Sequence, residues 1–155
     1  MTKKLIAYFS ASGVTKNAAE KLSKIDDDDL FEITPETTYT NADLNWQDQN
    51  SRTTKEKEDK TIRPAIKNTI DVSEYDTIIL GFPVWWYTYP NIISTFLEST
   101  DFSGKSIITF VTSGGTGVTG PVNDLEKAYP EISWKQRKRL TGSESQEELK
   151  EFINQ

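Results

Sequence analysis

The sequence predicts an α/β fold: a doubly wound three-layer sandwich in which a parallel sheet lies between two layers of helices. Continuous apolar runs near residues 5–9, 77–81 and 106–111 are typical of strands that are covered on both faces. Segments with helical spacing follow these runs, and the alternation of strand and helix favours right-handed crossovers between parallel strands. The 155 residues are enough to bury a core, and we expect residues 1–155 to form a single domain.

The first half of the chain contains two predicted strands with a helix between them. After the strand at residues 5–9, apolar side chains recur at helical spacing: Val14, Ala18, Leu22 and Ile25. Residues 30–33 form the second strand. Residues 36–73 are polar and irregular, with one helix predicted in the charged stretch after Ser51. A second helix is predicted to start at Pro64, because proline is favoured at the first helical position.

The second half alternates more regularly. The strand at residues 77–81 is followed by a helix that Pro90 opens, and the next strand leads through a Gly-rich turn to another helix. The last strand, within residues 132–140, carries several basic side chains. A closing helix is indicated by the capping box from Ser145 to Glu148 and the apolar stripe after it.

The composition excludes several classes of chemistry. The chain has no Cys and no His, so zinc sites, Ser-His-Asp triads and Cys nucleophiles cannot be built from it. A hydrolase with paired carboxylates stays open, although the acidic run at residues 26–29 is typical of a solvated turn. Otherwise the residues indicate no catalytic group and no metal site, and redox chemistry would belong to a cofactor.

The charge and the N-terminal sequence limit the partners and the location. The net charge of −6 argues against nucleic acid and against an anionic membrane surface as a partner. The first apolar stretch is too short for a signal peptide or a spanning helix. We therefore expect a cytoplasmic protein that acts without a membrane.

A hydroxyl-rich turn connects the first strand to the first helix. Its residues are Ser10, Ala11, Ser12, Gly13, Val14 and Thr15. A helix start directs unpaired N–H groups and the positive end of its dipole at the turn, and both favour an anion. The hydroxyls can donate further hydrogen bonds, and Gly13 lets the backbone approach closely. Taken alone, the turn is explained equally well as a helix cap.

An aromatic loop follows the strand at residues 77–81. It contains Pro83, Val84, Trp85, Trp86 and Tyr87. Such a concentration of flat side chains offers surfaces on which a planar ring can stack. The alternative is a patch that binds a protein partner or a second copy of the chain as a homodimer.

A Gly-rich loop follows the strand at residues 106–111. It contains Thr112, Ser113, Gly114, Gly115 and Gly117. With Gly120 it matches the dinucleotide fingerprint G-x-G-x-x-G, but it follows a late strand, and the next strand offers Arg137 and Arg139 where an acidic ribose ligand is expected. We favour a tight turn whose backbone binds the polar edge of a ring, and a merely flexible turn is the alternative.

The three loops together match the phosphate, the ring faces and the pyrimidine edge of FMN. In doubly wound folds a ligand binds beyond the carboxyl ends of the strands, where one pocket can collect all three loops. The chain resembles the flavodoxin family here. The hydroxyl-rich turn is similar to the family's phosphate signature, S/T-x-S/T-G-x-T, and the other two loops look like the flavin loops of one branch. That branch also carries the stretches Asn45, Trp46 and Ser51, Arg52 in its second connection.

The resemblance implies a flavodoxin-like parallel sheet of five strands in the order 2-1-3-4-5 and an FMN site. The phosphate contacts it implies are Ser10, Ala11, Ser12, Gly13, Val14, Thr15 and Asn17. The residues that would flank the ring are Pro83, Val84, Trp85, Trp86 and Tyr87. Those that would hold its edge are Thr112, Ser113, Gly114, Gly115 and Gly117.

Two roles compete within that interpretation, and a third lies outside it. One is an electron carrier that docks on a redox partner protein, and the other is an NAD(P)H-dependent reductase of quinones or other small acceptors. An acidic face with little substrate space favours the carrier, whereas an open cleft closed by residues 41–60 favours the reductase. The third is a flavin-free protein-interaction module on the same scaffold.

One departure from the family bears on electron transfer. Many small electron-carrier flavodoxins have a Gly in the aromatic loop, where a peptide flip stabilises the semiquinone, but residues 84–87 include none. Bulky side chains resist the positive φ that such a flip needs. We therefore expect weaker semiquinone stabilisation and a preference for two-electron transfer.

Overall fold

The sheet consists of five parallel strands in the order β2-β1-β3-β4-β5. The computed structural model describes residues 4–11, 13–45, 47–113 and 117–154. The strands are β1 (Lys4–Tyr8), β2 (Asp29–Glu32), β3 (Thr77–Pro83), β4 (Ser106–Thr112) and β5 (Ser133–Arg139). The predicted doubly wound α/β fold and its strand order are confirmed.

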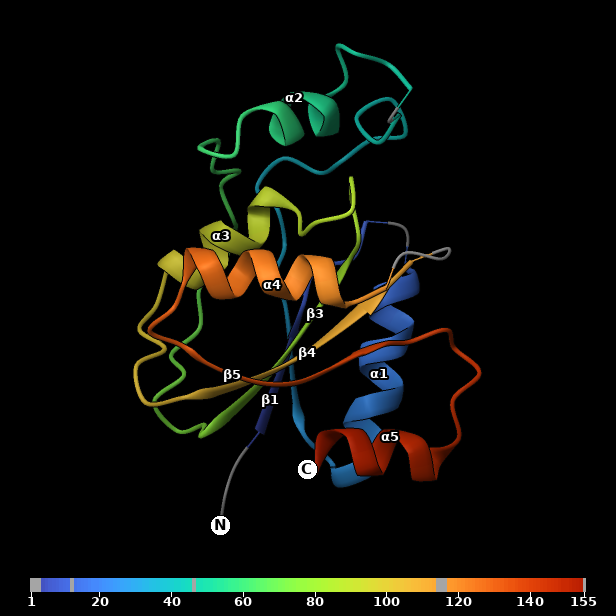
Figure 1. The fold of residues 1–155 in the computed structure, drawn as a ribbon, viewed down its shortest axis with the longest axis vertical. Helices are drawn as coiled ribbons and strands as arrows, with labels where there is room; N and C mark the ends of the chain where they lie inside the picture. Colours follow the sequence, from blue (N-terminus) through green and yellow to red (C-terminus); the bar gives the residue numbers. More distant parts are fainter. Residues whose placement is uncertain (1–3, 12, 46, 114–116, 155) are drawn as a thin grey trace.

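Helices cover both faces of this sheet (Figure 1). They are α1 (Val14–Asp26), α2 (Arg52–Glu58), α3 (Asn91–Glu98), α4 (Thr119–Ala128) and α5 (Gln146–Ile153). α1 and α5 pack on one face, against Ile6 and Phe110, and α3 and α4 pack on the other, against Leu5 and Leu80. α2 lies apart from both layers, beyond the carboxyl ends of the strands (Figure 1). Within the described ranges, no helix is long and apolar enough to cross a membrane.

The middle parts of the central strands are mostly apolar because both of their faces are covered. Successive side chains of a strand point to opposite faces, so Leu5 and Ala7 of β1 enter one core cluster while Ile6 and Tyr8 enter the other. β5 lies at an edge of the sheet, and its side chains are only partly buried. This position explains why its pattern carries charges that a central strand excludes.

The predicted inner face of α1 is confirmed for Ala18, Leu22 and Ile25 and is wrong only at its first position, Val14. Val14 is 58% exposed, whereas Thr15 is buried together with Ala19 and Leu22. The hydroxyl of Thr15 pairs with that of Thr112, and this contact fixes which side of the first turn faces inward. A buried hydrogen bond therefore sets the rotation of the helix start, which hydrophobic spacing alone does not show.

The helix predicted after Ser51 is confirmed as α2, but the helix predicted at Pro64 does not form. Ile66 instead makes an antiparallel bridge with Pro35. The backbone N–H of Lys67 donates to the carbonyl of Thr34 at 2.8 Å. Long-range pairing thus satisfies this backbone, and it overrides the local preference of proline for a helix start.

Candidate functional site

The three loops singled out in the sequence meet at one edge of the sheet. They leave the carboxyl ends of β1, β3 and β4, which are adjacent strands. The hydroxyl oxygens of Thr15 and Thr112 lie 2.7 Å apart, and the backbone N–H of Val84 donates to the carbonyl of Thr112 at 3.0 Å. Each loop is therefore bonded to at least one of the others.

The hydroxyl-rich turn has the geometry of an anion cradle. The Ser10 hydroxyl accepts a hydrogen bond from the Gly13 N–H at 3.0 Å. Gly13 has φ 95°, and a Cβ there would meet nothing within 4 Å, so the backbone conformation itself requires glycine. Gly13 supplies no side-chain cap, and the first turn of α1 has no acidic residue. The first N–H groups of α1 are thus suited to an anion.

Thr112 is placed differently from the sequence prediction. We expected it at the polar edge of a ring, but its side chain is 5% exposed and bonds to Thr15, which is 2% exposed. The next residue, Ser113, is held from β5, because Arg139 donates from Nε to its hydroxyl at 3.0 Å and from Nη2 to its carbonyl at 3.1 Å. The start of the Gly-rich loop is therefore held by α1 through Thr15 and by β5 through Arg139.

Several predicted site residues lie outside the described residues. They are Ser12, Gly114 and Gly115, and Trp46 of the second connection also lies outside. Gly117, at the far end of the Gly-rich loop, is exposed. Asn17 donates its backbone N–H to the carbonyl of Gly13 at 3.0 Å, which is an ordinary bond of the first helical turn.

The aromatic loop contains a tight turn with an unusual backbone. Trp85 and Thr88 exchange two backbone hydrogen bonds, of 3.1 and 3.0 Å. Between them Trp86 has φ 55° and Tyr87 has φ 63°. Two central residues with positive φ define a type I′ turn, in which Asn-Gly is the usual pair.

The sequence predicted that bulky side chains resist positive φ in this turn, and the structure differs at two positions. Bulky side chains do occupy positive φ at positions 86 and 87, because the paired hydrogen bonds of Trp85 and Thr88 hold the backbone there. The preference for two-electron transfer stays a prediction.

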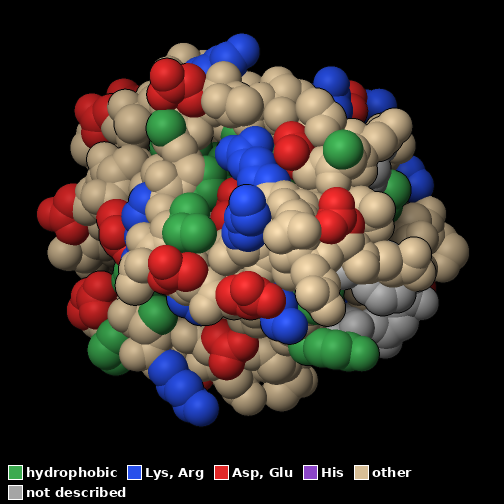
Figure 2. Space-filling model, turned by 90° about the horizontal axis from the view of Figure 1, so that it is seen from above, with side chains coloured by type: hydrophobic (Ala, Val, Ile, Leu, Met, Phe, Trp, Pro, Cys, Tyr) green, Lys and Arg blue, Asp and Glu red, His purple; other side chains and the backbone are tan. Residues whose placement is uncertain are grey.

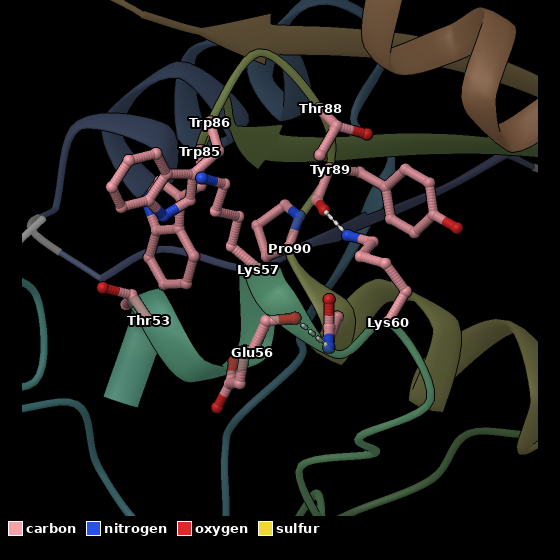
Figure 3. A pocket seen from close by; sticks show the side chains of 10 residues that line it. Thr53, Glu56, Lys57, Lys60, Trp85, Trp86, Thr88, Tyr89 and Pro90 are labelled. Atoms are coloured by element: carbon pink, nitrogen blue, oxygen red, sulfur yellow. Dashed lines mark hydrogen bonds between the residues drawn. The ribbon is translucent and has the colours of Figure 1, made fainter. Parts of the chain in front are cut away.

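The aromatic side chains of this loop point in different directions. The Trp85 ring packs edge-on against Phe9, with centroids 5.5 Å apart, and against Tyr39 at 5.3 Å. The Lys57 ammonium lies 4.4 Å from the centroid of Trp86. Both indoles lie on the side of the loop that faces α2 (Figure 3). Tyr87 projects outward and is 78% exposed.

A buried polar cluster beneath Trp85 was not found from the sequence. The Tyr39 hydroxyl donates to Glu56 Oε1 at 2.7 Å, and Arg52 Nε donates to Glu56 Oε2 at 3.1 Å. The Arg52 guanidinium also lies 3.7 Å from the centre of the Tyr39 ring. Burial raises the pKa of Glu56 and that of Tyr39. Arg52 and Glu56 are four positions apart in α2, a spacing that allows a helical ion pair, but nothing in the spacing shows that an aromatic ring packs on it.

α2 packs directly on the aromatic loop. The cavity between them measures about 10 Å³, the volume of about one water molecule, and Lys57, Trp86 and Pro90 are among its walls (Figure 3). Lys60 Nζ donates to the carbonyl of Tyr89 at 3.1 Å, and Asn91 Nδ2 donates to that of Glu56 at 2.9 Å. The second connection thus supports the aromatic loop here. A more open hollow of about 460 Å³ lies within that connection, with Asp43, Arg52 and Pro64 among its walls.

The two arginines considered for a dinucleotide phosphate are both engaged. Arg137 forms an ion pair with Glu126 and lies 3.4 Å from the side-chain oxygen of Asn123. Arg139 holds Ser113. Acidic and basic side chains are intermixed on the face that carries α2 (Figure 2). This arrangement does not favour a dinucleotide site at β5.

Comparisons with known proteins agree with this geometry. A family model described as flavodoxin matches residues 3–155. A crystal structure from Bacteroides uniformis, assigned as a flavoprotein, is 42% identical with a TM-score of 0.93, and the match covers 99% of each chain. A flavoprotein from Lactobacillus acidophilus, solved in complex with FMN, is 27% identical with a TM-score of 0.75, over 90% of this chain and 93% of that one. A search of curated proteins finds no match.

Proposed function

This chain belongs to the flavodoxin family, and on that premise we propose that it binds FMN and transfers electrons through the bound flavin. The observation that carries the proposal is the cradle at the start of α1, where Gly13 has φ 95° and the first turn lacks an acidic residue. Such a cradle fits a phosphate group. The related flavoprotein from Lactobacillus acidophilus, solved with FMN, supports the same ligand.

Each loop has its own part in this proposal. Ser10, Gly13 and Thr15 would bind the phosphate, and the aromatic and Gly-rich loops would orient the ring. FMN supplies the redox chemistry when it is bound, and the chain contributes binding, orientation and exclusion of water. The bond between Val84 and Thr112 supports a common site, because it links the loops on either side of the ring.

We favour the electron carrier over the reductase. A reductase needs space for a second substrate beside the flavin, and residues 41–60 were expected to close over that space. The cavity between α2 and the aromatic loop holds only about 10 Å³, which leaves no room for a quinone or a nicotinamide between these two elements. The more open hollow of about 460 Å³ in the second connection has Asp43, Arg52 and Pro64 among its walls, but none of the described residues that line it belongs to the three loops. That packing supports a role in which the flavin exchanges electrons with a docked protein.

The visible spectrum of the purified protein tests FMN binding. We expect a yellow protein that releases FMN, identified by chromatography, when it is denatured. If no flavin binds under any reconstitution, the scaffold serves as a protein-interaction module and the proposal fails.

Steady-state NAD(P)H oxidation with a quinone separates the two redox roles. The carrier role predicts turnover no faster than that of free FMN at the same concentration. Saturable turnover well above that of free FMN would assign the chain as a reductase and would leave FMN binding intact.

A further inference from the structure

We propose that Thr112 is a positioning residue that orients the hydroxyl of Thr15 toward the phosphate of the flavin. The inference rests on the proposed function, but it concerns a contact between two of the chain's own residues. Thr15 stands in the first turn of α1, and Thr112 ends β4. They are 97 positions apart in the sequence, and their hydroxyl oxygens lie 2.7 Å apart.

The chemistry of the two hydroxyls determines which of them donates when a phosphate is bound. In the protein alone either hydroxyl can donate to the other, because each has one O–H and two lone pairs. An ionised phosphate oxygen only accepts hydrogen bonds. Thr15 can donate to a phosphate only if it does not donate to Thr112, so Thr112 must then be the donor of the pair. The resulting chain runs from Thr112 to Thr15 to the anion, and each hydroxyl donates once.

Burial strengthens this arrangement. Thr15 is 2% exposed and Thr112 is 5% exposed, so solvent competes little for either hydroxyl. A buried hydroxyl that loses its partner is destabilised, and this cost keeps the pair together. A hydrogen bond to a charged acceptor is stronger than one between neutral groups, and a neighbour that donates to the same hydroxyl strengthens it further.

The side chain and the carbonyl of Thr112 contact different ends of the proposed site. Its side chain reaches the hydroxyl-rich turn, whereas its carbonyl accepts the N–H of Val84 in the aromatic loop at 3.0 Å. Replacement of the side chain removes the first contact and leaves the second. A Thr112 variant should therefore affect the phosphate of a ligand and spare its ring.

FMN and riboflavin distinguish these ends, because riboflavin carries the same ring without the phosphate. We expect Thr112→Val to weaken the binding of FMN to the apo-protein by about threefold to tenfold, the usual effect of losing one hydrogen bond between neutral groups, because Thr15 loses the neighbour that orients its hydroxyl. Riboflavin affinity should change less than about twofold. Thr112→Ser keeps the hydroxyl and should restore FMN binding. Thr109→Val is the matched control, since Thr109 is a buried threonine of the same strand and is 1% exposed.

A double-mutant cycle tests the chain of bonds itself. Because Thr112 acts through Thr15, the variant Thr15→Val/Thr112→Val should bind FMN no more weakly than Thr15→Val alone. Additive losses, equal losses for FMN and riboflavin, or unchanged FMN binding by Thr112→Val would each overturn the inference. If the unmodified protein binds FMN no more tightly than riboflavin, the inference also fails while flavin binding stands. If it binds neither flavin, the proposed function itself fails.

Discussion

The hydroxyl-rich turn and the aromatic turn both contain residues with positive φ, but glycine has it in the first and bulky aromatic residues have it in the second. Gly13 has φ 95° in the first, whereas Trp86 and Tyr87 have φ 55° and 63° in the second. Glycine adopts positive φ without strain, but a residue with a Cβ is destabilised there by about 1–2 kcal/mol. Strained positions of this kind persist where the side chains serve a purpose and the surroundings hold them.

The surroundings of the two turns differ accordingly. A Cβ on Gly13 would meet nothing within 4 Å, as suits a cradle that leaves room for a ligand. The aromatic turn is held by packing: Lys57 lies over Trp86, and Thr88 donates to Asp124 at 2.5 Å. One turn is open at its glycine, as the proposed binding of a phosphate requires, whereas contacts with α2 and α4 hold the other in place.

The largest expected effect comes from adding a β-branched side chain to the open turn. Gly13→Val cannot keep φ 95° without strain, so the N–H groups of the cradle move away from a phosphate. We expect FMN affinity to fall by on the order of a hundredfold, the sum of several weakened bonds to a charged group, as measured by flavin fluorescence quenching.

Gly142→Val is the matched control for this change. Gly142 has φ 94°, and a Cβ there would also meet nothing within 4 Å, but it lies between β5 and α5. It should lower stability similarly and leave FMN affinity unaltered. Equal losses of affinity in the two variants would mean that Gly13 contributes only to the fold.

The contribution of Glu56, beneath the aromatic turn, to the free energy of unfolding should depend on pH. Burial raises the pKa of Glu56, so its contribution to folding is fully present below the ordinary glutamate pKa of about 4.3 and declines as the pH rises through the raised value. Glu56→Gln removes that dependence and leaves Arg52 without its carboxylate partner. We expect its free energy of unfolding to be about 1–3 kcal/mol lower, with a larger deficit at pH 5 than at pH 7.

Urea unfolding of both proteins at the two pH values measures this difference. Glu58→Gln, at an exposed position of α2, should follow the unmodified protein at both. A Glu56→Gln deficit that is the same at pH 5 and pH 7 would contradict the assignment of a raised pKa.

Relief of the strained turn should stabilise the protein. Tyr87→Gly removes a backbone strain of about 1–2 kcal/mol. Glycine also makes the unfolded chain more flexible, which lowers the free energy of unfolding by about 0.5–1 kcal/mol. The ring is 78% exposed, so little burial is lost. We expect a net gain of about 0.5–1 kcal/mol in the free energy of unfolding, measured with denaturant. Tyr87→Ala keeps the Cβ and its strain, and a gain of the same size in that variant would rule out backbone strain as the cause.

The smallest expected effect concerns the contact between α2 and Trp86. Lys57→Met keeps most of the apolar stem and removes the charge over the ring, which should lower stability by about 0.5 kcal/mol and shift the tryptophan fluorescence. Lys55→Met, at an exposed position of the same helix, should alter neither. Identical spectra for Lys57→Met and the unmodified protein would show that the cation does not act on Trp86.

Local patterns predicted most of the architecture because the central strands are buried on both faces. The apolar runs of β1, β3 and β4 had one explanation, and the capping box predicted α5, where Ser145 accepts the N–H of Glu148. Pro64 was misjudged because its neighbours pair with residues 34–36, a long-range contact that no local preference encodes.

The candidate site was predictable in its loops but not in its contacts. The predicted fold placed Thr15 and Thr112 at the same edge of the sheet, after β1 and at the end of β4, yet it could not show that their hydroxyls meet. The positive φ values of Trp86 and Tyr87 contradict residue preference, because tertiary packing holds them. Tyr39 and Glu56 lay in a polar connection whose folding back onto Trp85 no sequence period reports.

Titration of the flavin-free protein with FMN, followed by quenching of flavin fluorescence, tests whether the three loops form one flavin site. We expect saturable binding of one FMN per chain, with quenching as the ring enters the aromatic loop. Fluorescence that rises in proportion to added FMN, as for the free flavin, would contradict the claim that the three loops form one flavin site.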